Sequence, residues 1–392
     1  MKNNFSFFFL SLCYMLCLLS CTLDSKKEYT KHKHNFVLEK TNIIKTIFHD
    51  SVSSPIQSQF RFYSEGDKSY IYCLNKLKNV LEIYHWDTGK LLKRITLEKE
   101  GPNGVSTITA FHIVNQDSVF VLATYSHRIS LIDSNGSLIR SYSLLPNGQT
   151  KEKLGNGLIS YGNYRHQMVY LNGSLFAPAS PFDGYEFSSF YNNGECGLRL
   201  NLQTGEVNPL MSFPKNWKQK FKEGLMLPGQ RIFIPQTFNL KKQTTIISFP
   251  TENYLFEVDL NNKRVNQYLC KSQYFDEIDW INRRKNTPGE EFIFHTKNPF
   301  YENIYFDAYR NIYLRFVAYP NTKKVDEFDG RAYFKYSLII LNESFEHIAE
   351  IPLDDEIRIG FAIITSEGIY FDEYIDSEDK SMFRLYKIKM EK

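Results

Sequence analysis

The sequence has few of the features that identify an enzyme or a nucleic-acid-binding protein. It contains no Gly-x-Ser-x-Gly turn, no His-Glu-x-x-His pair, no phosphate-binding glycine-rich loop ending in Lys-Ser or Lys-Thr, and no Cys-x-x-Cys pair. Its net charge is only +3 over 392 residues, too small for a nucleic-acid-binding surface. We therefore predict no catalytic residue, no cofactor and no nucleic-acid partner, although chemistry based on separated carboxylates such as Glu290 and Glu291 stays open.

Cysteine is scarce once its positions are considered. The chain has six cysteines, and three fall near the N-terminus: Cys13, Cys17 and Cys21. The other three are far apart: Cys73, Cys196 and Cys270. An odd number of widely spaced cysteines indicates no disulfide framework. One bridge is compatible with an oxidising compartment, but the sequence does not select the pair.

Metal-binding patterns are weak as well. His32 and His34 fall in a polar stretch, without further ligands at a metal-binding spacing. An acidic cluster near the C-terminus lacks the alternating ligand and glycine spacing of a calcium loop. We interpret this cluster as a solvated hairpin: Asp372, Glu373, Asp376, Glu378 and Asp379. We predict no metal site.

The chain begins with an apolar run over 5–19, which ends beside Ser20 and Cys21. Its ~15 residues match the apolar region of a secretory signal and fall short of the ~20 needed to span a bilayer. Leu18, Ser20 and Cys21 resemble the lipobox of bacterial lipoproteins, although Leu19 is larger than usual at its position. The segment predicts that acyl chains on Cys21 anchor the protein in the bacterial cell envelope, as an outer-membrane lipoprotein.

This interpretation divides the chain into a signal peptide over 1–20, a lipidated tether over 21–34 and a single domain over 35–392. Residues 22–34 are polar and lack apolar periodicity, as expected of a tether. An uncleaved anchor and an ordinary secretory signal are the alternatives. The sequence leaves open whether the domain faces the periplasm or the cell exterior.

The rest of the chain repeats a unit of four short β-strands joined by polar turns. Residues 107–144 contain four β-rich segments, with Gly136 suited to the hairpin between the last two. The third-to-fourth turn has an Asp or Asn, then turn-forming residues, then a fresh apolar alternation. It recurs, unevenly spaced, at five places: Asp87, Asp133, Asn201, Asp259 and Asn342. Uneven spacing predicts units that carry insertions.

Such units cannot bury both faces alone, so we predict an all-β fold, a six-bladed β-propeller. The sixth unit, over 360–389, has only three strands and would leave an open edge. The N-terminal segments 35–39 and 43–49 are predicted to supply the missing strand and close the ring. The alternatives are a pair of irregular β-sandwiches, or seven blades with a degenerate blade in 271–300.

Two insertions depart from the strand pattern. Trp217, Phe221 and Leu225 recur every fourth residue, which predicts an amphipathic helix over 215–225. Its lysines would suit anionic lipid, but we favour a helix that covers a sheet. Residues 271–290 are first aromatic and then basic, and predict a short helix and a loop over one face of the ring.

A turn over 97–105 carries a family resemblance. The residues Glu100-Gly101-Pro102-Asn103-Gly104, the following strand over 117–121 and the lipobox together resemble a Bacteroidetes-type lipoprotein family described as domain of unknown function 4221. The resemblance extends from about residue 35 to the end. It implies a six-bladed, TolB-like propeller in the envelope and no activity or catalytic residue. Because the proline fixes φ and the glycines relax it, we assign the turn itself to structure.

Aromatic residues make up 16% of the chain, with 26 Tyr and 32 Phe. Most are expected to pack between blades, because aromatic residues favour strands. Some fall in the loops that join successive blades, or the second and third strands of a blade, where propellers present ligands. The ligand-binding candidates are Tyr125, His127, Tyr164, Arg165, His166, Tyr185, Trp280 and Arg283. Aromatic faces with Arg and His would suit a peptide, a glycan or an anionic ligand.

Three functions follow. The first, which we favour, is a non-catalytic envelope lipoprotein that binds a ligand or a partner protein. The second is an envelope enzyme that acts on glycans or peptides through the propeller funnel, and the third is a structural subunit of an envelope complex. Converging carboxylates or histidines in the funnel would favour the enzyme, and an aromatic and basic surface would favour binding, because fold alone does not decide.

Overall fold

A computed structural model describes residues 36–53, 59–145, 158–160, 168–181, 195–223, 225–226, 234–275, 278, 281–282, 296–321, 334–355, 357–373 and 379–390. The predicted signal peptide and tether lie outside these ranges. Phe36–Lys392 forms one compact unit. Within the described part of the chain, no helix is both long and apolar enough to cross a membrane.

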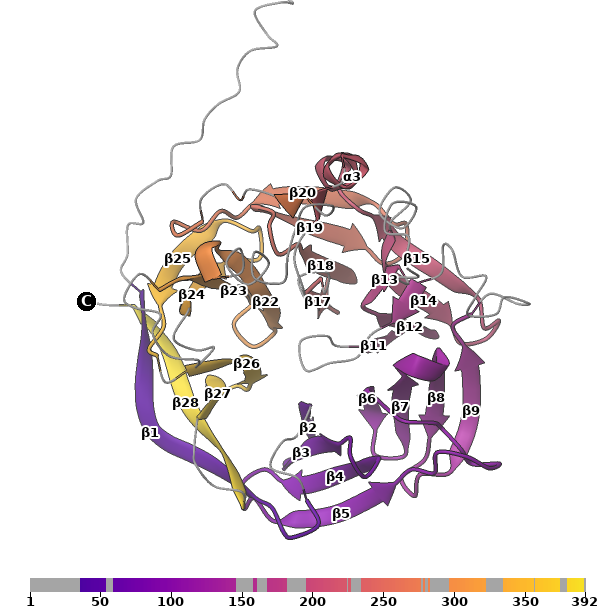
Figure 1. Cartoon of the computed structure of the whole chain (residues 1–392). Helices are drawn as coiled ribbons and strands as arrows, with labels where there is room; N and C mark the ends of the chain where they lie inside the picture. Colours follow the sequence, from indigo (N-terminus) through magenta and orange to yellow (C-terminus); the bar gives the residue numbers. More distant parts are fainter. Residues whose placement is uncertain are drawn as a thin grey trace, which may run out of the picture. The chain divides into compact units, whose positions relative to one another are not determined.

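Six four-stranded antiparallel sheets follow one another around a ring, with the first strand of each nearest the axis (Figure 1). Blade 1 contains β2 (Phe60–Glu65), β3 (Lys68–Asn75), β4 (Val80–His85) and β5 (Leu91–Thr96). Blade 2 contains β6 (Ala110–Asn115), β7 (Ser118–Ala123), β8 (Arg128–Ile132) and β9 (Leu138–Ser143). Blade 3 contains β11 (Val169–Leu171), β12 (Ser174–Ala177), β14 (Glu195–Asn201) and β15 (Val207–Ser212).

The second half of the ring has the same organisation. Blade 4 contains β17 (Gln236–Asn239), β18 (Thr244–Ser248), β19 (Tyr254–Asp259) and β20 (Val265–Leu269). Blade 5 contains β22 (Phe300–Asp307), β23 (Ile312–Pro320), β24 (Phe334–Leu341) and β25 (His347–Pro352). Blade 6 contains β26 (Ile357–Ile364), β27 (Ile369–Glu373), β28 (Lys380–Met390) and β1 (Phe36–Phe48). The ring has six blades, as the repeats predict.

The N-terminal strand closes the ring, as predicted. β1 pairs antiparallel with β28, from Phe36 opposite Met390 to Phe48 opposite Lys380, and Figure 1 shows indigo β1 beside yellow β28. The register shifts at Thr41, whose side chain donates to the carbonyl of Leu385 (2.8 Å). Because the last blade takes its fourth strand from the other end of the chain, the outer side of β28 is paired rather than open.

The third-to-fourth turns confirm the repeat and correct its first position. Side-chain oxygens of Asp133, Asn201, Asp259 and Asn342 accept backbone N–H groups two to four residues later. In blade 1 this acceptor is Nδ1 of His85, which receives the N–H groups of Asp87 and Thr88. The prediction that Asp87 anchors the first turn was therefore wrong by two residues. Gly136 has φ +86°, which confirms its predicted place in a hairpin.

Apolar side chains fill the wedges between neighbouring blades. One cluster joins blades 1 and 2 through Tyr72 and Phe111, and another joins blades 5 and 6 through Phe316 and Phe371. The three cysteines of the domain are buried free thiols in blades 1, 3 and 4: Cys73, Cys196 and Cys270. The core between blades thus holds the ring together without a disulfide among these cysteines.

The insertions add two short two-stranded sheets and a helix. β10 (Leu158–Ser160) pairs with β13 (Ala179–Pro181), and β16 (Leu225–Met226) pairs with β21 (Ile281–Asn282). The helix α3 (Lys215–Lys222) confirms the predicted amphipathic segment, and its Trp217 is buried against Phe249 in the cluster between blades 3 and 4. Leu225 belongs to β16 rather than to the helix, so its predicted place on the helical face was wrong.

Candidate functional site

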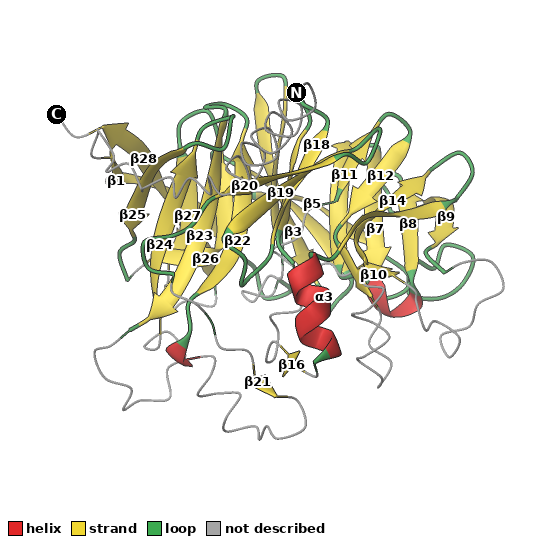
Figure 2. Cartoon of the chain, turned by 90° about the horizontal axis from the view of Figure 1, so that it is seen from above, coloured by secondary structure: helices red, strands yellow, loops and turns green. Residues whose placement is uncertain are grey.

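The two ends of the ring differ in construction. At one end, the insertion face, lie the loops that join successive blades and those between second and third strands. At the other, the hairpin face, lie the turns between first and second and between third and fourth strands. Figure 2 shows α3, β16 and β21 together at one end and short turns at the other. The antiparallel order of strands in every blade produces this division.

A cavity of about 380 Å³ lies on the ring axis and is lined by residues of, or beside, all six inner strands. Its lining includes Ala308 and Tyr309 from the turn between β22 and β23, and so reaches the hairpin face. Aromatic and aliphatic side chains make up most of the rest, including Phe60 and Tyr305. The volume lies at the small end of the range of small-molecule sites.

Arg61, on β2, is the cation in the described lining of this cavity, and that lining contains no acidic residue. Burial lowers the pKa of its guanidinium to about 10, so the side chain stays charged at neutral pH. Its Nη1 donates to the carbonyl of Phe60 (2.9 Å). Arg61 therefore contributes a positively charged side chain to the described lining.

His112, on β6, lines the same cavity as a neutral imidazole. Burial, with a smaller effect from the charge of Arg61, lowers its pKa to about 4. Its Nε2 accepts the backbone N–H of Tyr170 (3.1 Å) next door in blade 3, which assigns the ring proton to Nδ1. His112 thus joins blades 2 and 3 through Nε2, and its Nδ1–H is a neutral hydrogen-bond donor rather than a second charge.

Further side chains join neighbouring inner strands. Gln59 donates to the carbonyl of Thr109 (3.1 Å), and Asn303 donates to that of Ile359 (3.0 Å). The N–H of Phe306 donates to Oγ1 of Thr237 (3.0 Å), across the boundary between blades 4 and 5. These bonds connect inner strands directly rather than through the outer parts of the blades. They hold the wall of the cavity in one arrangement.

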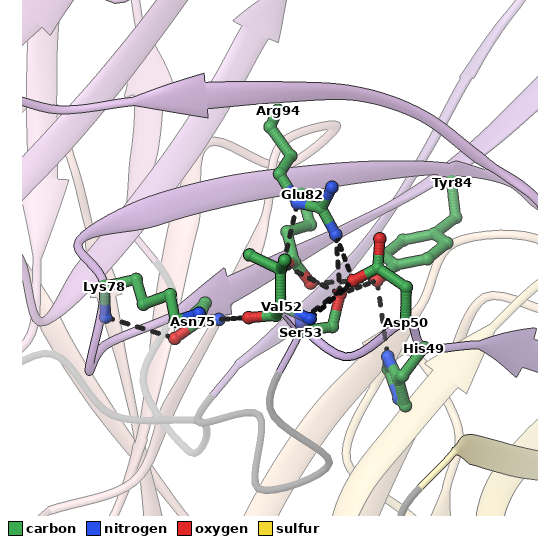
Figure 3. Close-up of polar contacts among 9 residues, drawn as sticks. All are labelled: His49, Asp50, Val52, Ser53, Asn75, Lys78, Glu82, Tyr84 and Arg94. Atoms are coloured by element: carbon green, nitrogen blue, oxygen red, sulfur yellow. Dashed lines mark hydrogen bonds and ion pairs between the residues drawn. The ribbon is translucent and has the colours of Figure 1, made fainter.

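A second polar cluster lies at the seam where blade 6 meets blade 1 (Figure 3). Glu82 is fully buried and accepts hydrogen bonds from Tyr84 (2.8 Å) and Ser53 (2.9 Å). It also forms an ion pair with Arg94 (3.3 Å). Arg94 also contacts Asp50 (2.6 Å), which follows β1, and its hydrogen bond lowers the pKa of that carboxyl. We call these residues, with His49 and Ser381, the seam cluster.

His49 and Ser381 resemble the base and nucleophile of a hydrolase, because Nε2 of His49 lies 2.8 Å from Oγ of Ser381. Both side chains are buried, and neither lines the central cavity. Burial lowers the pKa of His49. The pair joins β28 to the residue after β1, and we assign it to closure of the ring.

The sequence-based candidates fall on the insertion face or outside the described residues. Tyr125 lies in the short helix η1 (Thr124–Ser126) between β7 and β8 and is 74% exposed. His127 follows it, buried in the left-handed conformation (φ +49°), and its backbone joins Thr124 and Leu144. Neither lines the central cavity. The remaining candidates lie outside the described ranges: Cys21, Tyr164, Arg165, His166, Tyr185, Trp280 and Arg283.

Arg61 and His112 were missed because each sits inside a strand, surrounded by apolar residues. The signal in the sequence is a cationic or imidazole side chain within the first strand of a repeat, which is the strand nearest the axis. Metal ligands do not gather either: no group of three or more His, Cys, Asp or Glu in the described ranges has the geometry to hold an ion. In the acidic cluster, Glu373 instead forms an ion pair with Arg384.

Comparisons with known proteins agree with this fold. A solved structure of a DUF4221 family member from Bacteroides vulgatus superposes with a TM-score of 0.74 at 22% identity, covering 91% of this chain and 99% of that one. A protein from Bacteroides fragilis superposes with a TM-score of 0.55 at 11% identity, covering 90% and 95%. Among curated proteins there is no significant match. The model of the family described as Domain of unknown function (DUF4221) matches residues 34–352, and the chain therefore belongs to that family.

Proposed function

We propose that this protein is a non-catalytic binding lipoprotein of the bacterial cell envelope, and that the central cavity of the propeller is its ligand site. The observation that carries the proposal is the cavity itself: a space of about 380 Å³, lined mostly by aromatic and aliphatic residues, with one arginine and one neutral histidine. Small-molecule sites have this composition, in which a few polar groups orient a ligand held by apolar contacts.

The same residues argue against hydrolysis in this cavity. General acid–base catalysis on glycans or peptides uses titratable groups with pKa values near the working pH, often two carboxylates. The described lining has no carboxylate, and His112 has a pKa of about 4 and already accepts a hydrogen bond through Nε2.

Placement in the envelope rests on the N-terminal sequence. Cys21 follows the lipobox residues Leu18 and Ser20, and precedes β1 by a polar stretch. Acyl chains there would hold the propeller at a membrane while leaving its cavity in water.

The cavity is tested by blocking its mouth. Ala308 is exposed at the hairpin face and lines the cavity, so Ala308→Trp should obstruct it. Lys241, in the equivalent turn of blade 4, does not line the cavity, and Lys241→Trp is the matched control. Protein purified from native envelopes is denatured, and the released small molecules are measured by mass spectrometry. Wild type and the control should release the same compound, and Ala308→Trp should release little. Equal release from all three proteins would overturn the proposal.

The anchor is tested separately by processing. Cells treated with globomycin, which blocks lipoprotein signal peptidase, should accumulate the unprocessed chain. Cys21→Ser should abolish labelling by a fatty-acid analogue and release the protein from the membrane fraction. Normal processing under globomycin would remove the lipoprotein assignment and leave the cavity proposal standing.

A further inference from the structure

We propose that a polar groove on blade 4 binds a neutral sugar, at a site separate from the central cavity. The groove has a volume of about 380 Å³, and strands β18, β19 and β20 with the turns beside them supply its described lining. Ile246 and Leu255, on the same side of the sheet, belong with Phe345 to the apolar cluster between blades 4 and 5. The groove therefore faces blade 5. It shares no described lining residue with the central cavity, so this inference does not depend on the proposed function.

The strand register brings the polar side chains of the groove together. Thr244 pairs with Asp259, and Glu257 lies two residues earlier on the same side of β19. Asn266 on β20 pairs with Glu257, and the carbonyl of Arg264 accepts the N–H of Asp259 (2.9 Å). Thr244 and Arg264 are therefore both diagonal neighbours of Glu257, at the spacing of about 7–8 Å that such neighbours have. One small ligand is long enough to contact all three.

Two buried polar groups of the groove lack partners that such groups normally have. Thr244 is 8% exposed, and its Oγ1 has no hydrogen-bond partner among the described residues. Thr245, on the other side of the same strand, donates to the carbonyl of Thr237 (3.1 Å). Glu257 is 9% exposed and accepts the hydroxyl of Tyr268 on Oε2 (2.9 Å), but no cation among the described residues forms an ion pair with it. Because buried polar groups are normally hydrogen-bonded, Thr244 and Glu257 indicate a polar partner in the groove.

The charges of the groove favour a neutral ligand. Glu257 and Asp259 are balanced in number by Lys242 and Arg264, so a singly charged ligand would meet repulsion as well as attraction. Both carboxylate oxygens of Asp259 accept hydrogen bonds from its own turn, and Nζ of Lys242 donates to the carbonyl of Glu343 in blade 5 (2.5 Å). Arg264 is exposed, and its guanidinium is paired with no described residue. Glu257 and Arg264 are therefore the charged groups most open to a ligand.

The hydrogen-bonding groups favour a ligand with neighbouring hydroxyl groups. A carboxylate only accepts hydrogen bonds and a guanidinium only donates them, whereas a hydroxyl group does both. Adjacent hydroxyls of a sugar would donate to Glu257 and accept from Arg264, and the hydroxyl of Thr244 would bond in either direction. Hydrogen bonds to charged groups are the stronger ones. The described lining has no aromatic or aliphatic residue, so an apolar ligand would gain little there.

The experiment measures binding of small probes to the purified chain by saturation-transfer difference NMR. The probes are four neutral sugars, glucose, galactose, mannose and N-acetylglucosamine, with glycine as a zwitterion. Glu257→Gln, Arg264→Gln and Thr244→Val each remove one group of the groove. Arg140→Gln changes an exposed arginine on β9, the equivalent outer strand of blade 2, and is the matched control. Ala308→Trp obstructs the central cavity, and thermal unfolding establishes that every variant is folded.

Wild type, Arg140→Gln and Ala308→Trp should bind at least one of the four sugars with the same Kd. Glu257→Gln and Arg264→Gln should raise that Kd at least about fivefold, and Thr244→Val at least about threefold. Arg264→Gln decides the outcome should a variant of a buried residue fail to fold, because Arg264 is exposed. Binding of none of the sugars, tighter binding of glycine than of every sugar, or an unchanged Kd in Arg264→Gln would overturn the proposal. Loss of sugar binding in Ala308→Trp would assign the sugar to the central cavity instead, and would overturn it as well.

Discussion

The seam cluster makes a quantitative prediction about the closure of the ring. The substitution Tyr84→Phe removes one hydroxyl group and keeps the buried ring in place. That hydroxyl donates to Oε2 of Glu82 (2.8 Å) and also contacts His49 (3.3 Å) and Ser53 (3.1 Å). Burial raises the pKa of Tyr84, so the phenol stays protonated and remains a donor at any pH near neutrality. The change therefore deletes hydrogen bonds at the blade 6–blade 1 boundary and nothing else.

The magnitude follows from the burial of Glu82. A hydrogen bond to a charged group contributes about 1.5–3 kcal/mol, and Glu82 is fully buried but still accepts from Ser53 and Arg94. We expect a loss of about 2 kcal/mol in the free energy of unfolding. For a unit of about 360 residues the unfolding entropy is about 0.75 kcal/mol/K, so Tm should fall by about 3 °C.

Tyr370 is the matched control. It is also fully buried, and its hydroxyl donates to Oε2 of Glu367 (2.6 Å). Unlike Glu82, Glu367 is exposed. Tyr370→Phe should cost about 1 kcal/mol or less, because water replaces the lost donor. Denaturant unfolding followed by far-UV circular dichroism measures both variants. Equal losses for the two would refute the reasoning that burial of the acceptor decides the cost.

Three other changes test the surrounding structure. Gly89→Ala would place a Cβ 1.8 Å from the carbonyl oxygen of Thr46 in β1, at a residue with φ +65°, and should destabilise the seam by at least about 2 kcal/mol in denaturant unfolding. Asn79→Ala removes bonds from a buried amide to the carbonyls of Leu97 and Ser106 and should cost about 2–4 kcal/mol, with faster proteolysis between blades 1 and 2; unchanged proteolysis would contradict it. Burial lowers the pKa of His112 in the folded chain to about 4, so below about pH 6.5 the unfolded chain takes up a proton that the folded chain does not. The free energy of unfolding should therefore fall by up to about 3 kcal/mol between pH 6.5 and pH 4 because of this residue. His112→Gln should flatten the dependence of stability on pH in this range.

The parts of the fold that could be predicted from the sequence depend on interactions between residues close together in the chain. An Asp or Asn that caps its own turn needs only the next few residues, which is why Asp133, Asn201 and Asp259 mark their hairpins correctly. His85 plays this part with a ring nitrogen, and a search for carboxylates and amides passed over it. Leu225 continued a helical period that the chain abandons for a strand pairing with Ile281–Asn282, far along the sequence. The periodicity of apolar residues along a segment contains no information about a strand partner so far away in the sequence.

The sequence by itself determined the four-stranded repeat, the six blades and the N-terminal strand that closes the ring, because each depends on local strand and turn patterns or on an edge that must be paired. Only the tertiary structure decided which side chains meet on the axis. Arg61 and His112 are about fifty residues apart, and Thr237, Tyr305 and Ala362 lie much farther along the chain, yet all five line one cavity. The inner strand of every blade contributes only a few residues, and their common surface exists only when the six blades have packed through their apolar wedges.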